Sequence, residues 1–320
     1  MSERMKLPPE KDCGFYQRRK HDKWREVAPP DPPLEGPIAD SHAHVHSLPD
    51  PAWELVRCAA NNVKFVCEIC DPSEDTLDIP DDVRKWQAAS EVSDLPIMRI
   101  TAGVHPHNAK LYDDEVEKLL MKWLEAPETV IVGEIGLDYH YDLSPRDVQR
   151  KVFRRQVQIA KELDMPISLH LRGGDPEPAS ESSEPPTPTY SNAHREAFEI
   201  LQDVGFPSRG TILHCCALPP EELQPWIDAG CYIAYGGTLT FKTADAAREG
   251  ARIVPADRLL LETDSPYMAP EPMRGAACTP AHVIFSAAHL AEIRGIAPGQ
   301  DRERFLAQLM ANTRRIFGLD

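Results

Sequence analysis

The sequence predicts an α/β fold of the TIM (β/α)8 barrel class, a single domain that follows an N-terminal extension. Short apolar runs rich in β-branched residues recur along the chain, amphipathic segments separate them, and eight such runs follow residue 35. Strand–helix alternation indicates a parallel sheet, and eight units of this length indicate a closed barrel. The alternative is an open doubly wound sheet, which is disfavoured because no G-x-G-x-x-G motif follows the first strand.

Each expected strand is an apolar, β-branched run, and turn-forming residues separate it from the next element. The eight runs are residues 36–42, 63–69, 97–104, 129–135, 166–171, 210–215, 230–236 and 258–264. Between them, residues 113–126 and 146–165 carry apolar side chains near helical spacing, which predicts two amphipathic helices.

Two segments lie outside this alternation. Residues 1–35 end in "APPDPPLEGP" and predict an extended arm ahead of the barrel, which we expect over residues 36–320. Residues 173–192 are rich in Pro, Ser and Glu and predict a flexible acidic insert after the fifth strand. Two alternatives exist for this insert: an acidic flap that repels other polyanions, or an inert surface loop.

Composition restricts the class of protein. With 42% hydrophobic and 27% charged residues the chain is globular, and no apolar run approaches the roughly 20 residues of a membrane span. The N-terminus lacks the apolar core of a secretory signal, and eight scattered cysteines suit a reducing compartment. We therefore expect a cytoplasmic protein without a membrane partner. The sequence does not determine the oligomeric state, for which a monomer is favoured. The lone C-x-x-C at 67–70 is expected to hold buried thiols.

The formal net charge of −16 argues against a general nucleic-acid coat protein, whose binding depends on Lys and Arg. It does not argue against a nucleic-acid enzyme, because bound metal ions can supply local positive charge in an acidic site.

Polar residues gather at the ends of five predicted strands, which is where barrels of this class carry their chemistry. They are His42, His44, Glu134, His170, His214 and Asp264. Imidazole and carboxylate donors suit divalent Mg, Mn, Zn or Fe. Six ligands exceed the three of one catalytic zinc, so we expect two ions that share a bridging carboxylate, for which Glu134 is the natural candidate. The alternative is a set of unrelated, hydrogen-bonded strand ends.

The run "DSHAHVH" places Asp40, His42, His44 and His46 on one register, because alternate side chains of a strand face the same way. Asp40 is expected either to orient a ligating histidine or to pack inside the barrel. His46 lies where the strand should end, so we expect a loop histidine there rather than a ligand.

Several motifs resemble, in order, those of the TatD-like metal-dependent deoxyribonucleases. They are "DSHAH", "AGVHPH", "VGEIGLDYH", "RRQVQIAKELDMPISLHLR", "ILHC" and "LLLETDSPYMAP". The resemblance implies a TIM barrel with two divalent ions that hydrolyses phosphodiesters in DNA, as an exonuclease acting on single strands or ends. Residue by residue, it implies that His42, His44 and Asp264 bind one ion, that His170 and His214 bind the other, and that Glu134 bridges them. Asp264 and Glu134 would then be catalytic.

Three further residues are candidates for substrate binding. His105, in "GVHPH" with His107, is expected to line the pocket at the end of the third strand. Arg172 and Arg274 lie on the active face, where a guanidinium could hold a phosphate as a bidentate fork. For each arginine the alternative is a surface salt bridge.

Two other functions compete with the nuclease. One is an amidohydrolase or esterase acting on a small molecule or on aminoacyl-tRNA, since fold does not determine function. Many such enzymes bridge their metals with a carboxylated Lys from the fourth strand. Here that strand carries Glu134 and no Lys is near, which favours the nuclease. The other is an inactive scaffold, and the complete ligand set weighs against it.

Overall fold

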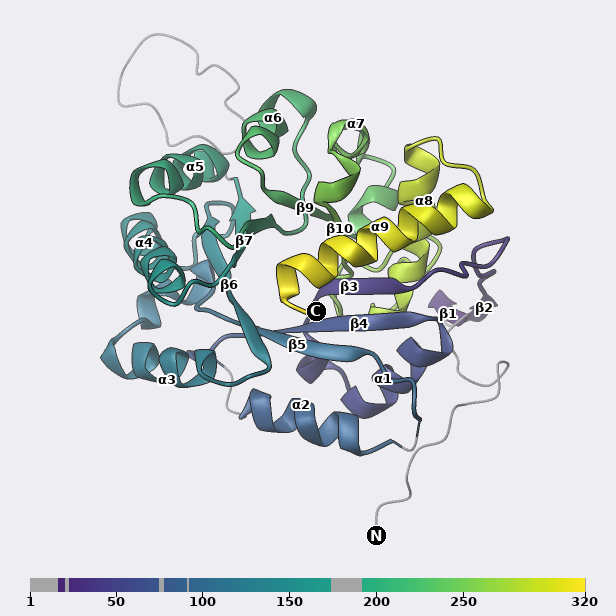
Figure 1. Cartoon of the computed structure of the whole chain (residues 1–320), viewed down its shortest axis with the longest axis horizontal. Coiled ribbons are helices and arrows are strands. Elements are labelled where there is room, and N and C mark those ends of the chain that lie inside the picture. The colour runs from purple at the N-terminus through teal and green to yellow at the C-terminus, as the bar shows by residue number, and fades with distance from the viewer. Residues whose placement is uncertain (1–16, 21–22, 75–77, 91, 174–191, 320) are drawn as a thin grey trace. The chain divides into compact units, whose positions relative to one another are not determined.

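The computed structural model describes residues 17–20, 23–74, 78–90, 92–173 and 192–319. Strands and helices alternate along these ranges from β3 to α9 (Figure 1). Residues 1–16 of the predicted arm and 174–191 of the predicted acidic insert lie outside the described residues.

The eight predicted strands are present, and they form one sheet in chain order from β3 to β10. The pairs β3–β4, β6–β7, β7–β8 and β9–β10 are parallel. The strands are β3 (Ile38–Ala43), β4 (Val63–Cys70), β5 (Ile97–Ala102), β6 (Thr129–Asp138), β7 (Ile167–Arg172), β8 (Thr211–Leu213), β9 (Tyr232–Tyr235) and β10 (Leu259–Leu261).

Helices separate the strands, and α3 and α4 lie where the apolar spacing predicts them. The α-helices are α1 (Pro51–Ala60), α2 (Ile79–Ala88), α3 (Asp114–Leu124), α4 (Arg146–Glu162), α5 (Asn192–Val204), α6 (Pro220–Asp228), α7 (Asp245–Ile253), α8 (Val283–Ile293) and α9 (Gln300–Phe317). Short 3-10 turns are η1 (Val45–Ser47), η2 (Pro106–Leu111), η3 (Gly237–Thr240), η4 (Ala256–Arg258) and η5 (Pro280–His282). This order of elements confirms the predicted (β/α)8 class.

The strand boundaries differ from the prediction at three points that matter for the site. β8 and β10 end at Leu213 and Leu261, so His214 and Asp264 lie in the turns that follow rather than on the strands. β6 continues to Asp138, beyond the expected end at residue 135. A hydrophobic run in the sequence can include residues that are buried without pairing to a neighbouring strand. The run therefore does not show where the backbone hydrogen bonds between two strands end.

The chain divides into two compact units. The first contains the described residues of 1–69, 77–100 and 214–320, and the second those of 70–76 and 101–213. Within the first unit the last strand is joined to the first. Ala43 and Ser265 form a parallel bridge, and the Asp264 N–H donates to the His42 carbonyl at 2.9 Å.

Helix α9 packs against β3 in the first unit, where Figure 1 draws it in yellow beside the purple strand. Phe317 of α9 contacts Phe65 of β4, with ring centroids 4.8 Å apart. Both rings are buried, as are Cys67 and Cys70 of β4, which confirms the prediction of buried thiols. The C-terminal helix therefore covers the first two strands of the sheet.

The described part of the arm contains a hairpin that was not predicted, in which β1 (Gln17–Lys20) pairs antiparallel with β2 (Lys23–Glu26). The residues that lead into β3 are held by α9. Arg302 donates to the Pro33 carbonyl at 2.6 Å, and the Glu303 carboxylate accepts from the backbone N–H groups of Glu35 and Gly36. The entry into β3 is thus set by tertiary contacts.

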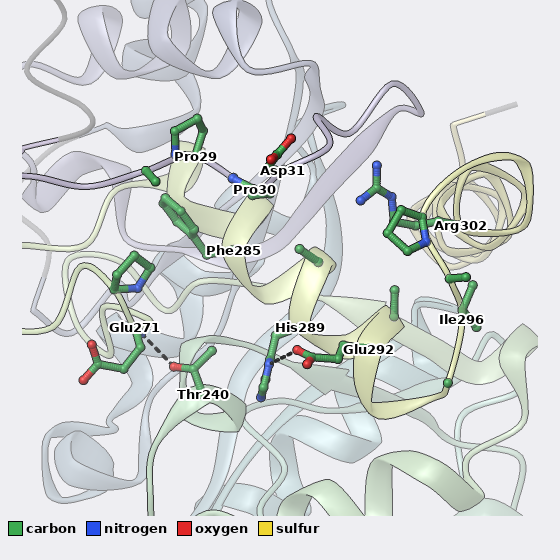
Figure 2. Close-up of a pocket in the computed structure, with 17 residues that line it drawn as sticks. Pro29, Pro30, Asp31, Thr240, Glu271, Phe285, His289, Glu292, Ile296 and Arg302 are labelled. Atoms are coloured by element: carbon green, nitrogen blue, oxygen red, sulfur yellow. Dashed lines mark hydrogen bonds and ion pairs between the residues drawn. The ribbon is translucent and has the colours of Figure 1, made fainter.

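The arm also helps to line a cavity of about 740 Å³ in the first unit, together with α8 and the start of α9 (Figure 2). Its wall includes Pro29, Pro30, Phe285, Ile296 and Arg302. None of the six predicted metal ligands lines this cavity, so it is separate from the candidate site described below.

Close packing between β6 and β7 in the second unit depends on Gly136. Its φ is +152°, and a Cβ at this position would lie 1.9 Å from the His170 carbonyl oxygen. Only glycine allows the two backbones to approach in this way. Gly136 therefore determines how β7 presents His170.

We expect the Gly136→Ala variant to lose more stability than the Gly230→Ala variant. Gly230 also has positive φ (+78°), but no atom lies within 4 Å of its added Cβ. Gly230→Ala should cost about 1–2 kcal/mol, from backbone strain alone. Gly136→Ala should cost about 1–3 kcal/mol more, from overpacking. Denaturant unfolding of both variants measures the difference, and equal losses would contradict the packing role of Gly136.

Candidate metal centre

The first unit brings together three of the predicted ligands, His42, His44 and Asp264. His42 lies in β3 and His44 just beyond its end. The Nε2 atoms of His42 and His44 lie 3.9 Å and 3.6 Å from Asp264 Oδ1. Two imidazoles and a carboxylate, with one donor atom of each within 4.8 Å of the others, are a donor set that suits a divalent ion.

The backbone of Asp264 is in the left-handed region, with φ at +60°. It is held there by the hydrogen bond to His42 and by the Tyr267 N–H, which donates to the Asp264 carbonyl at 2.8 Å. Positive φ at a non-glycine residue persists only where the surroundings impose it. Burial opposes ionisation, but the hydrogen bond from His44 and the charges of His214 and His42 hold the pKa of Asp264 below its ordinary value.

His214 lies in the same unit, where its ring stacks on that of His42 at a centroid distance of 3.7 Å. Its Nδ1 is 3.3 Å from Glu262 Oε2, and the other oxygen of Glu262 accepts from the Cys215 N–H at 2.6 Å. Glu262 follows β10 directly and was missed in the sequence. The only available signal was its spacing of two from Asp264.

Asp40 binds the backbone of β3 and the segment that follows β10. Its carboxylate accepts from the Thr263 hydroxyl at 2.6 Å, the Thr263 N–H at 2.9 Å and the backbone N–H of His42 at 3.2 Å. Of the two roles expected for Asp40, these contacts support packing of β3 against the segment after β10. Burial raises the pKa of Asp40 well above its ordinary value.

His46 has a specific partner in the first unit. Its Nδ1 contacts a carboxylate oxygen of Glu68 in β4, and the other oxygen of Glu68 accepts from the Val45 N–H at 2.8 Å. Glu68 is completely buried. The 3-10 turn that follows His44 is therefore attached to the second strand of the sheet.

The second unit places Glu134 of β6 beside His170 of β7. Glu134 Oε1 lies 2.7 Å from His170 Nδ1 and 3.8 Å from His105 Nε2. Glu134 is buried, and the side chains of His170 and His105 are partly exposed. These residues offer a carboxylate and two imidazoles.

Asp138 at the end of β6 is the residue that the sequence analysis missed in this unit. Its Oδ2 lies 2.8 Å from His107 Nε2 and 3.2 Å from His170 Nε2. Its Oδ1 accepts from the backbone N–H groups of His140 and Tyr141, each at 2.9 Å. Burial opposes ionisation, but the hydrogen bonds from His107 and His170 outweigh it and hold the pKa of Asp138 well below its ordinary value.

His105 and His107 lie next to His170. The ring centroid of His105 is 4.3 Å from those of both His107 and His170, and one nitrogen of each of the three lies within 4.8 Å of the others. His105 was expected to line the pocket, and its place beside Glu134 and His170 is compatible with that role.

The two arginines predicted to bind phosphate both stack on aromatic rings. The Arg172 guanidinium lies 4.7 Å from the ring centroid of Tyr141, in the second unit. The Arg274 guanidinium lies 3.8 Å from the ring centroid of Phe241, in the first unit, and its backbone carbonyl accepts from Arg18 at 3.2 Å. The alternative for each arginine was a surface salt bridge. Within the described part of the chain, neither side chain forms one.

The family of this chain is shown by comparison with known proteins. The profile of the family described as TatD related DNase matches residues 39–318. The chain belongs to this family. The match to the TatD related DNase family covers every residue of the two groups just described, from Asp40 to Asp264.

Individual relatives support the assignment to the TatD related DNases. The "Uncharacterized metal-dependent hydrolase YabD" of Bacillus subtilis (strain 168) is 31% identical over 287 residues, which cover 88% of this chain and 100% of YabD. The "3'-5' ssDNA/RNA exonuclease TatD" of Citrobacter koseri is 31% identical over 224 residues, 68% of this chain and 77% of that protein. The crystal structure of YJJV, a TatD homolog from Escherichia coli K12, matches with a TM-score of 0.73 at 23% identity, over 88% of this chain and 98% of YJJV.

Family membership and the histidine–carboxylate groups together support binding of divalent metal. Among the described helices, none is both long and apolar enough to cross a bilayer.

We expect Asp138→Asn to weaken metal binding by about 10- to 100-fold, as loss of a carboxylate that orients a ligating histidine does elsewhere. Asn has the same shape but lacks the charge that holds His107 and His170 in place. Titration of the metal-free protein with Mn²⁺ or Zn²⁺ measures the change. The matched control is Asp142→Asn, whose exposed carboxylate pairs with Arg146. Unchanged affinity in Asp138→Asn would contradict an orienting role.

Proposed function

We propose that this chain is a metal-dependent nuclease that hydrolyses phosphodiester bonds in single-stranded DNA or RNA, starting from an end. The observation that carries the proposal is the group of His42, His44 and Asp264 in a chain of the TatD related DNase family. The name of the Citrobacter koseri relative, a 3'-5' ssDNA/RNA exonuclease, supports this substrate class.

The proposed centre holds two divalent ions, Mg²⁺, Mn²⁺ or Zn²⁺. His42, His44 and Asp264 would hold one, and His170 with His214 would hold the other, with Glu134 shared between them. The donor chemistry fits, since every proposed ligand is an imidazole or a carboxylate. When bound, such ions activate water at neutral pH and offset the charge of the phosphate.

The residues of the chain supply the proton transfer. Although Asp264 is buried, its pKa stays below the ordinary value, so the carboxylate remains ionised at neutral pH and can accept the proton of the attacking water. Attack on phosphorus then forms one P–O bond and breaks another, and the departing oxygen takes up the proton held by Asp264 and leaves as an alcohol. Arg172 and Arg274 remain candidates to hold phosphate, because a guanidinium stacked on a ring keeps its N–H edge available.

One assay tests the proposal against its alternative. Metal-reconstituted protein is offered labelled single-stranded DNA, RNA and duplex DNA, together with a panel of carboxylic esters and amides. We expect stepwise shortening of the single strands and no turnover of the panel. Turnover of an ester or amide without nuclease activity would replace the proposal with the amidohydrolase alternative.

Asp264→Asn tests the role of the proposed base. It keeps a ligand oxygen but removes the proton acceptor, so turnover should fall by the roughly 10²–10⁴-fold typical of general-base loss, while part of the metal remains bound. Single-turnover cleavage with parallel metal analysis measures both. Asp245→Asn is the control, since that side chain is 84% exposed on α7, and its activity should be unchanged. Near-normal turnover of Asp264→Asn with full metal content would refute the role.

Metal stoichiometry tests the proposed ligand sets. After reconstitution and desalting, the unmodified chain should hold two ions by elemental analysis. His44→Ala and His170→Ala should each lose one ion, and Glu134→Gln should weaken both. His289→Ala, a partly exposed histidine on α8, should retain two. A stoichiometry of one in the unmodified chain would contradict the binuclear centre.

A further inference from the structure

We propose that two exposed tyrosines are stacking platforms for the bases of a nucleic-acid substrate: Tyr267 in the first unit, and Tyr141 with Arg172 in the second. The proposal rests on the proposed function and adds which side chains bind the bases of the substrate. Tyr267 is 58% exposed and its ring stands beside the candidate ligand His44, and Tyr141 is 53% exposed and its ring stands beside His107. Proteins that bind single-stranded nucleic acid commonly present exposed aromatic rings on which bases stack.

Tyr267 is exposed but its position is fixed. Its N–H donates to the Asp264 carbonyl at 2.8 Å, and the carbonyl of the preceding Pro266 accepts from the Cys278 N–H at 3.0 Å. The ring stands edge-to-face to the His44 ring, with centroids 6.0 Å apart. A base that stacked on Tyr267 would therefore bring its own phosphate close to His44 and Asp264.

Tyr141 is attached to the second unit in a corresponding way. Its N–H donates to Asp138 Oδ1 at 2.9 Å, and its ring stands edge-to-face to His107 with centroids 5.5 Å apart. The Arg172 guanidinium lies over the ring at 4.7 Å. An aromatic ring with a stacked guanidinium forms a flat, cationic surface, and nucleobases bind to surfaces of this kind.

The charge of the chain explains why stacking is needed. With a net charge of −16, the chain has little general attraction for a polyanion. Stacking supplies affinity without positive charge, and every base has a π face, so the grip tolerates any sequence. An enzyme that shortens a strand stepwise needs this tolerance, because each nucleotide in turn must occupy the same position.

The experiment compares Tyr267→Ala, Tyr267→Phe, Tyr141→Ala and Tyr141→Phe on two single-stranded oligonucleotides. One has ordinary bases and the other has abasic sugars at its terminal nucleotides. On the ordinary strand, each Ala variant should raise KM about 5- to 100-fold, while each Phe variant keeps its ring and stays near the unmodified value. On the abasic strand the Ala variants should match the unmodified chain, because there is no base to stack.

Salt provides a second readout. Stacking releases no counterions, so the ratio of KM between each Ala variant and the unmodified chain should stay constant as salt is raised. Leu143→Ala is the matched control near Tyr141, because Leu143 is 52% exposed but not aromatic, and its KM should not change. Metal content is measured for every variant, because a substitution that removes only base stacking should leave the metal content unchanged.

The outcomes separate this proposal from the proposed function. An Ala variant with unchanged KM, or one that loses equally on ordinary and abasic strands, overturns the platform at that tyrosine. If the unmodified chain cleaves no nucleic acid, fluorescence anisotropy with the same oligonucleotides decides. If binding depends on both the bases and the tyrosines, the stacking proposal is supported and the nuclease proposal is refuted. If there is no such binding, both proposals are refuted.

Discussion

The closure of the sheet between β3 and the segment after β10 is the constraint on which the candidate centre depends. The Asp264 N–H donates to the His42 carbonyl at 2.9 Å, and the His44 N–H donates to the Ser265 carbonyl at 2.8 Å. Asp40 adds a buried link to Thr263, 223 positions along the chain. These bonds bring residues from opposite ends of the family match into one group, and they hold Asp264 in its left-handed conformation. Without the closure, no local feature of the chain would place a carboxylate beside His42 and His44.

A second arrangement recurs three times around the histidines. A fully buried carboxylate directs one oxygen to backbone N–H groups and the other to an imidazole nitrogen. The three cases are Glu262 with Cys215 and His214, Asp138 with the 140–141 turn and with His107 and His170, and Glu68 with Val45 and His46. Buried carboxylates are costly unless their oxygens are satisfied, so each arrangement commits the ring to a defined orientation. Two of the candidate ligands, His214 and His170, are thus contacted by acids that are not themselves in the predicted ligand set.

Much of the fold can be read from the sequence, because its signals are local. The strand and helix order follows from apolar runs and amphipathic spacing, and β3, β4, β7, α3 and α4 lie within two or three residues of the predicted bounds. The alternation of His42 and His44 at a strand end is also a local pattern. So is the position of polar residues after successive parallel strands, which indicated where the chemistry should lie.

The partners of those residues were decided by the tertiary structure alone. Glu262, Asp138 and the role of Glu68 are not predictable from the sequence, because an acidic residue in or just after a strand looks the same whether it faces solvent or a histidine. The predicted strand also ran on to Asp264, because apolar periodicity does not show where backbone pairing ends and a left-handed turn begins. The β1–β2 hairpin and the exposure of the Tyr267 and Tyr141 rings are likewise not visible in the local sequence. Pairing partners and exposure depend on contacts between segments far apart in the chain. Composition and spacing alone determined the class of fold and the type of donor atoms, and long-range hydrogen bonding determined which donors meet.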